Sequence, residues 1–151
     1  MIIWGTGHRE EKIPNVSNLR LVLQEQFTSI APDAFVCGMA NGFDLVAGNV
    51  ALDHGIAVVA AKPWTTHGPR KSDREAYARV IDLAEEVYVV TEADHYPGPW
   101  AYQKRNEWMV DSADRGLAFW DGSSGGTYNC IKYAERVKKP IRNIYGQVVS
   151  K

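Results

Sequence analysis

The stretch GLAFWDGSSGGTYNCIKYAERV, residues 116–137, contains three successive patterns. Residues 116–120 form a short apolar run that is typical of a buried strand. Residues 121–126 are rich in glycine and serine, and residues 127–137 repeat apolar side chains at helical spacing. A buried strand that passes through a tight turn into a helix is the repeating unit of parallel α/β sheets.

The same alternation of patterns extends over the rest of the chain. Short apolar runs predict strands at residues 1–4, 34–37, 56–61, 86–90, 116–120 and 141–144. Helical spacing predicts helices at residues 16–30, 43–54, 70–84, 101–113 and 127–137. The order predicts an α/β fold, a Rossmann-like three-layer sandwich with a mainly parallel sheet of about six strands.

Length and composition narrow the class of protein. With 151 residues, 45% of them hydrophobic, we expect a single domain over residues 1–151. The sequence has no apolar run of membrane-spanning length and no signal-peptide pattern, so we expect a cytoplasmic protein without a membrane partner. The net charge of −1 disfavours a nucleic-acid partner. Cys37 and Cys130 fall in predicted elements, which favours buried free thiols over a disulfide.

Glycine, histidine and tryptophan residues concentrate after the predicted strands rather than before them. They lie in the segments GTGHR (5–9), GMANGFD (38–44), KPWTTHG (62–68), TEADHYPGPW (91–100) and DGSSGGT (121–127). In open parallel sheets, ligands bind in the crevice beyond the carboxyl ends of the strands. The one-sided distribution therefore predicts a ligand site at this edge.

The turn at residues 121–127 is the strongest candidate for an anion site. Glycines let the backbone approach a ligand, and the free amides and dipole of the following helix suit a phosphate. An ordinary helix cap without a ligand is the alternative. The candidate ligand-binding residues here are Asp121, Gly122, Ser123, Ser124, Gly125, Gly126 and Thr127.

Two further turns have candidate ligand-binding residues. In the turn after the second strand these are Gly38, Met39, Ala40 and Asp44. Asp44 could accept hydrogen bonds from ribose hydroxyls, or its negative charge could simply complement the helix dipole. After the first strand they are Gly5, Thr6, Gly7 and Arg9, where a guanidinium can bind two phosphate oxygens. Glu10 stands where the third glycine of a dinucleotide fingerprint belongs, which disfavours an ordinary NAD domain.

Some polar and aromatic residues allow more than one interpretation. Arg105 and Asn106 could contact the ligand or be surface polar groups. The histidines match no compact metal-ligand motif, so we expect neither a metal nor another cofactor. We expect one of Trp64, Trp100 and Trp120 to stack on a base, although large aromatic residues usually serve packing first.

Three segments carry a resemblance to a known superfamily. They are GTGHR (5–9), CGMANGFDLVAGNVAL (37–52) and RNEWMVDSADRGLAFWDGSSGGTYNCIKYA (105–134). The chain resembles the SLOG superfamily, which includes YpsA-like proteins, the DNA-processing protein DprA and the Lonely Guy phosphoribohydrolases. It is most similar to YpsA-like and phage-borne members. The resemblance implies a bacterial or phage protein with a Rossmann-like fold that binds a nucleotide through its glycine turn, as a homodimer or higher homo-oligomer.

The resemblance also shows where the sequence departs from the Lonely Guy enzymes. Their turn ends in a glutamate that helps to cleave an N-glycosidic bond, and Cys130 stands at that position here. Catalysis would then need Asp44, Glu107 or Asp121 as the general acid or base. We therefore expect a module that senses or sequesters a nucleotide-derived phosphorylated ligand. A nucleotide N-glycosidase and a DprA-like accessory protein for single-stranded DNA are the alternatives.

Overall fold

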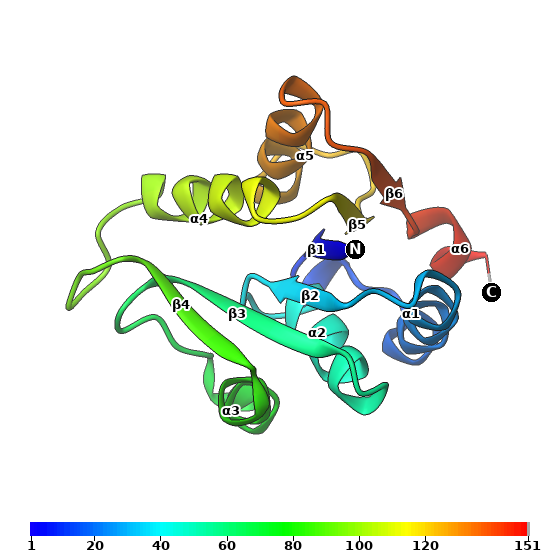
Figure 1. Cartoon of the computed structure of the whole chain (residues 1–151), viewed down its shortest axis with the longest axis horizontal. Helices are drawn as coiled ribbons and strands as arrows, with labels where there is room; N and C mark the ends of the chain where they lie inside the picture. The colour runs from blue at the N-terminus through cyan, green and yellow to red at the C-terminus, as the bar shows by residue number, and fades with distance from the viewer. Residues whose placement is uncertain (151) are drawn as a thin grey trace.

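The computed structural model describes residues 1–150 as six parallel strands in the order β4-β3-β2-β1-β5-β6 (Figure 1). All strand pairs are parallel, which confirms the predicted α/β fold. The strands are β1 (Ile2–Gly7), β2 (Ala34–Cys37), β3 (Ala57–Trp64), β4 (Glu86–Thr91), β5 (Arg115–Phe119) and β6 (Ile141–Asn143).

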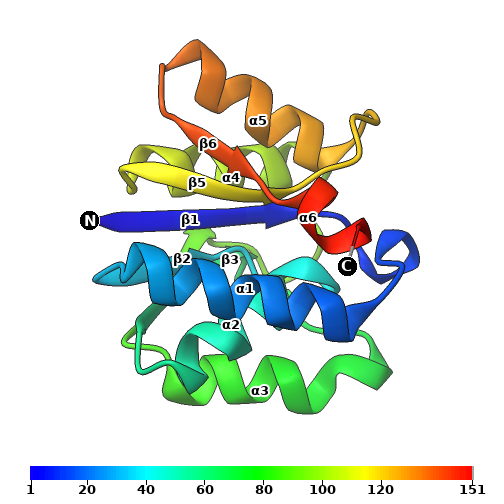
Figure 2. The ribbon, with the colours of Figure 1, turned by 90° about the vertical axis from the view of Figure 1, so that its right-hand side faces the viewer.

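Helices cover both faces of the sheet and complete three layers (Figures 1 and 2). One face has α1 (Val16–Ile30), α2 (Phe43–Asp53), α3 (Arg74–Leu83) and the short α6 (Tyr145–Val149). The other face has α4 (Trp100–Asp111) and α5 (Gly126–Arg136). Short 3-10 turns, η1 (Glu10–Lys12) and η2 (Lys71–Asp73), precede α1 and α3.

The predicted elements are all present, and the largest differences lie at their ends. β1 continues to Gly7, three residues beyond its predicted end, because it pairs with β5 as far as Gly7 opposite Phe119. A Cβ on Gly7 would lie only 2.3 Å from Cγ of Phe43. This glycine therefore permits close packing inside a strand. The sequence pattern did not predict α6, whose five residues are too short for a periodic signal.

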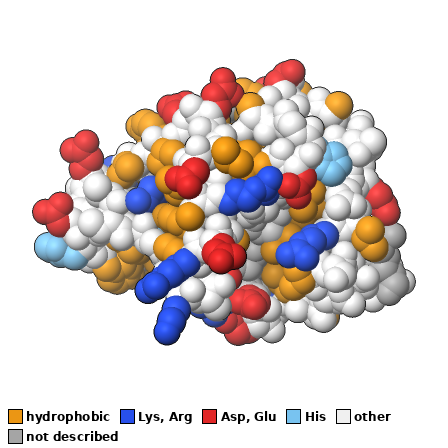
Figure 3. All heavy atoms as spheres, turned by 90° about the horizontal axis from the view of Figure 1, so that it is seen from below, with side chains coloured by type: hydrophobic (Ala, Val, Ile, Leu, Met, Phe, Trp, Pro, Cys, Tyr) orange, Lys and Arg blue, Asp and Glu red, His pale blue; other side chains and the backbone are white. Residues whose placement is uncertain are grey.

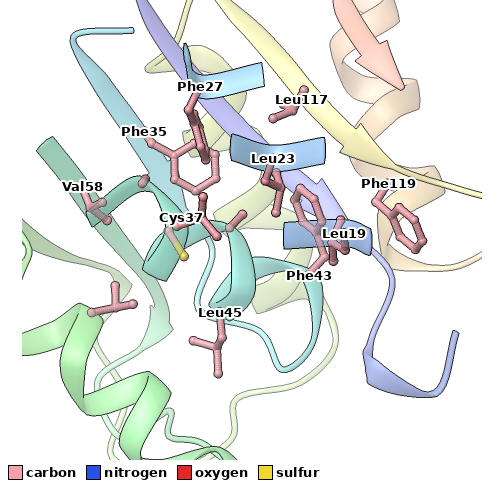
Figure 4. Packing of buried hydrophobic residues seen from close by; sticks show 14 of the residues in the cluster. Leu19, Leu23, Phe27, Phe35, Cys37, Phe43, Leu45, Val58, Leu117 and Phe119 are labelled. Carbon is pink, nitrogen blue, oxygen red and sulfur yellow. The ribbon is translucent and has the colours of Figure 1, made fainter. Parts of the chain in front are cut away.

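The larger hydrophobic core lies between the sheet and the layer of α1, α2 and α3 (Figure 4). It contains four phenylalanines from different elements: Phe27, Phe35, Phe43 and Phe119. A smaller core beneath α4 and α5 contains Trp4 and Met109. Both cysteines are free and buried, as the sequence predicted.

The strand order places a topological switch between β1 and β5. From β1 the chain proceeds through β2 and β3 to β4 at one edge, and then crosses back to β5 on the other side of β1. The loops that follow β1 and β5 therefore diverge and leave a crevice at the carboxyl ends of these strands. Within residues 1–150, no helix is both long enough and apolar enough to cross a membrane.

Candidate ligand-binding cleft

A cleft of about 500 Å³ lies at this switch point, between the loops after β1, β2 and β5 and the inner face of α4. The fold brings together at its wall most of the residues that the sequence singled out. These are Thr6, Gly7, Arg9, Ala40, Asp44, Arg105, Asn106, Ser123, Ser124, Gly125, Gly126 and Thr127.

The other candidates do not line this cleft: Gly5, Gly38, Met39, Glu107, Asp121 and Gly122. A Cβ on Gly5 would lie 2.5 Å from the Phe35 ring, so this glycine permits packing. Met39 is buried and has a left-handed backbone with φ 66°. Glu107 accepts a hydrogen bond from Gln103 on α4. These residues shape the site from behind or lie outside it.

The first turn of α5 faces the cleft without a side-chain cap. Its N-cap, Gly125, has φ 140° and ψ −162°, a conformation that is essentially restricted to glycine. No side chain caps this helix end, and the first turn has no acidic residue. A Cβ on Gly125 or Gly126 would meet no heavy atom within 4 Å. The amides at this end are therefore open to an anion.

Asp121 stabilises the turn that leads to α5. Its Oδ1 accepts hydrogen bonds from the backbone N–H of Ser123, at 2.9 Å, and from the Ser123 hydroxyl. His8 Nε2 lies 2.8 Å from the same oxygen. The bonds from Ser123, with a smaller contribution from His8, keep the pKa of Asp121 well below its usual range. Asp121 is therefore ionised at neutral pH and is poorly suited to act as a general acid.

Arg105 and Asn106 of α4 are buried, with 6% and 4% of their surface exposed, so they are not surface polar groups. The Arg105 guanidinium donates to the Gly38 carbonyl through Nη1 and to Asn106 Oδ1 through Nε, at 3.2 Å. Asn106 Nδ2 donates to the Gly126 carbonyl at 3.4 Å. This pair links the turn after β2 to the start of α5 and places a fixed positive charge beside the cleft.

Asp44, in the first turn of α2, is the cleft's buried carboxyl group, with 5% exposure. Its Oδ2 accepts a hydrogen bond from the Ala40 N–H at 3.1 Å. Burial raises the pKa of Asp44 to about 6, and the nearby Arg105 opposes this effect. The Asp44 carboxyl therefore changes its protonation state near neutral pH. It can accept hydrogen bonds from ligand hydroxyls or exchange a proton with the ligand.

Tyr102 is one of several cleft residues that the sequence analysis did not single out, with Lys12 and Tyr128 among the others. Its ring centroid lies 6.0 Å from Cζ of Arg9 and 5.9 Å from Cζ of Arg105. A signal was present, since Tyr102, Arg105, Asn106 and Met109 recur at positions i, i+3, i+4 and i+7 and so share one helix face. We expected one of Trp64, Trp100 and Trp120 to stack on a base, but none of them lines the cleft.

Cys130, at the position of the Lonely Guy glutamate, lies beneath the cleft rather than in its wall. It is fully buried, and burial raises its thiol pKa to about 11. A neutral buried thiol is a poor nucleophile and a poor general base. Among residues 1–150, no group of three or more His, Cys, Asp or Glu side chains is arranged to bind a metal ion.

A second hollow, of about 520 Å³, lies on the other face among η1, α1, α2 and α3. Its charged side chains are largely paired: Glu10 and Asp73 with Arg70, and Asp53 with Arg79. Figure 3, seen from the side of α3, shows charged and hydrophobic side chains interspersed over this face. The hollow lacks the open amides and buried cation of the first cleft, which is therefore the stronger candidate.

The fold and the cleft together define a Rossmann-like α/β domain with its crevice at the topological switch point. The chain belongs to the YspA SLOG family, whose sequence model matches residues 6–147. It is similar to the uncharacterized SPbeta prophage-derived protein YoqJ of Bacillus subtilis (strain 168), with 41% identity over 69 residues. That match covers 40% of this chain and 40% of the relative.

Solved structures share the fold at low sequence identity. DNA processing protein A (DprA) of Streptococcus pneumoniae has a TM-score of 0.69 at 14% identity, over 93% of this chain and 49% of that one. DprA of Helicobacter pylori has a TM-score of 0.70 at 16% identity, over 92% of this chain and 63% of that one, and is described by its single-stranded DNA binding mode. The chain therefore spans less than two thirds of each of these relatives.

Proposed function

We propose that this protein binds a nucleotide or nucleotide-derived phosphorylated ligand in the cleft, as a sensing or sequestering module. The observation that carries the proposal is the uncapped, glycine-lined start of α5, which opens into a cleft with cationic side chains. Arg9, Lys12 and Arg105 contribute positive charge. The Asp44 carboxylate can accept hydrogen bonds from the hydroxyl groups of a ligand. A phosphorylated sugar matches this combination of groups.

Membership of the SLOG family supports the proposal, because the resemblance implies nucleotide binding through this turn. The missing glutamate at Cys130 favours binding without hydrolysis. The near-neutral charge still favours a small ligand over nucleic acid. Single-stranded DNA nevertheless belongs in the test, since the described Helicobacter pylori relative binds it.

Thermal unfolding with a ligand panel tests the proposal. The panel contains inorganic phosphate, ribose 5-phosphate, nucleoside mono- and diphosphates, ADP-ribose and a single-stranded oligonucleotide. A ligand at 100 times its Kd stabilises the folded state by about 2.7 kcal/mol, which raises the Tm of a chain of this size by roughly 5–10 °C. No shift with any phosphorylated ligand would refute the proposal.

The variant Gly126→Ala tests the phosphate site without destabilising the fold. The first helical position accepts alanine, and its Cβ meets no heavy atom within 4 Å, so the free variant should unfold at or above the wild-type temperature. The Cβ tilts toward the helix start and obstructs the anion. Hydrogen bonds to a charged group contribute about 1.5–3 kcal/mol, so we expect affinity to fall at least tenfold. Glu107→Gln, outside the cleft, is the matched control.

A specific observation favours nucleotide N-glycosidase activity as a second candidate. Asp44 lines the cleft, and its pKa near 6 suits general acid–base catalysis. Incubation of the protein with nucleoside monophosphates should then release free base, and Asp44→Asn should abolish the release. If the wild-type protein at high concentration releases no base, the cleft only binds its ligand.

A further inference from the structure

We propose that Tyr102 is the specificity-determining residue of the cleft, and that it stacks on the aromatic base of a nucleoside 5′-phosphate while Arg9 covers the outer face of the base. The inference rests on the proposed function, because it orients the ligand from the phosphate site at α5. It adds to the proposed function the side chains that recognise the base of the nucleotide.

The position of Tyr102 along α4 sets its distance from the phosphate site at the start of α5. Asn106 donates to the carbonyl of Gly126, so this part of α4 lies beside the start of α5. Tyr102 precedes Asn106 by four residues, which is about 6 Å along a helix axis. An aromatic ring therefore lines the cleft about one helical turn from the open amides. In a nucleotide, a ribose separates the phosphate from the base in the same way.

Groups suited to a ribose lie next to this stretch of α4. A Cβ on Gly38 would lie 2.8 Å from Asp44 Oδ2 and 3.2 Å from Arg105 Cζ, so the carboxyl and the guanidinium are near neighbours. Both line the cleft. A carboxylate oxygen accepts the hydroxyl hydrogens of a sugar. The wall thus presents amides, a hydroxyl acceptor and an aromatic ring.

Other aromatic side chains fix the Tyr102 ring in place. Trp64 packs edge-on against it, with centroids 5.4 Å apart at 77°, and Tyr96 lies 6.2 Å away. Trp64 is itself buried, at 8% exposure. Because the ring is already ordered by this packing, stacking a base on it costs little side-chain entropy.

Arg9 is placed to form the second wall. Its guanidinium carbon lies 6.0 Å from the Tyr102 ring centroid, and its side chain is exposed. A base between the guanidinium and the ring needs a stacking distance of roughly 3.5 Å on each side, so these two groups must lie about 7 Å apart. An outward movement of about 1 Å would therefore admit a planar base between the guanidinium and the ring. Arginine stacks on flat aromatic groups in this way, whereas lysine does not.

Tyr128 is the competing aromatic residue and provides the matched control. It also lines the cleft, but on the first turn of α5, where its ring lies 6.0 Å from the Trp120 ring and 5.4 Å from Lys132 Nζ. A base on Tyr128 would lie directly beside the phosphate site. The separation that a ribose imposes therefore favours Tyr102.

Calorimetric titration with ribose 5-phosphate and a nucleoside 5′-monophosphate tests the inference, because the two probes differ by the base. The wild-type protein should bind the nucleotide at least tenfold more tightly. Tyr102→Leu should remove this preference and leave ribose 5-phosphate affinity within about twofold. Tyr102→Phe should retain it, and Arg9→Lys should reduce it. Thermal unfolding of each free variant verifies that it is folded.

The outcomes distinguish the two proposals. If neither probe binds the wild-type protein, the inference fails, and the proposed function fails with it only if the thermal-unfolding panel also shows no shift with any phosphorylated ligand. If the two probes bind equally, or if Tyr128→Leu rather than Tyr102→Leu removes the preference for the nucleotide, the phosphate site stands and the assignment of Tyr102 is wrong.

Discussion

Replacing Asp44 with asparagine should make the protein more stable at alkaline pH. Burial raises the pKa of this carboxyl from 3.8 to about 6 in the folded chain. Between pH 4 and pH 6 the folded state therefore binds a proton that the unfolded state has released, so stability falls as the pH rises through this range. Above pH 6 the folded state bears the full free-energy cost of keeping the buried Asp44 carboxyl ionised. At about 1.4 kcal/mol per pKa unit, it amounts to about 3 kcal/mol.

Asparagine retains an oxygen that can accept from the Ala40 N–H and removes the buried charge. Urea unfolding should therefore show Asp44→Asn to be more stable than the wild-type protein by about 1 kcal/mol at pH 4.5 and by about 3 kcal/mol at pH 8. Asp121→Asn is the control of opposite sign, because the folded state lowers the pKa of Asp121. A stability difference for Asp44→Asn that does not change with pH would refute the argument.

Three further predictions concern the backbone and the thiols. Gly125→Ala forces alanine into a conformation with φ 140°, which should cost about 1–3 kcal/mol and lower the Tm. Ala31→Gly should raise the Tm by a few degrees in calorimetry, because Ala31 ends α1 with φ 46° and glycine adopts this conformation without strain. Cys37 and Cys130 are buried and have raised pKa values, so a thiol reagent should modify them only in denaturant.

Much of the fold could be predicted because its signals are local. The periodicity of residues 16–30 and the short apolar run at residues 34–37 predicted α1 and β2 with the bounds that the structure shows. The end of β1 could not be predicted in this way. Gly5 and Gly7 are typical of a turn, yet the rings of Phe35 and Phe43 need their empty space inside a strand.

The candidate site also has one part that local sequence predicted and one part that it did not. The glycine turn before α5 was evident from the sequence, because its residue types are those that a tight turn and an open helix start require. Tyr102 was missed, since an aromatic residue on a helix has the same local pattern whether it faces a core or a cleft. Its packing against Trp64 and its distance to Arg9 depend on segments far apart in the chain.

The sequence by itself determined the alternation of strands and helices, the edge at which the glycine turns gather and the absence of a glutamate at Cys130. These follow from backbone preferences and side-chain periodicity, which act over a few residues. Only the tertiary structure decided that α4 faces the start of α5, that Arg105 and Asp44 are buried together, and that Asp121 is a turn carboxylate. Desolvation and long-range packing set these properties, and neither is encoded in any local pattern.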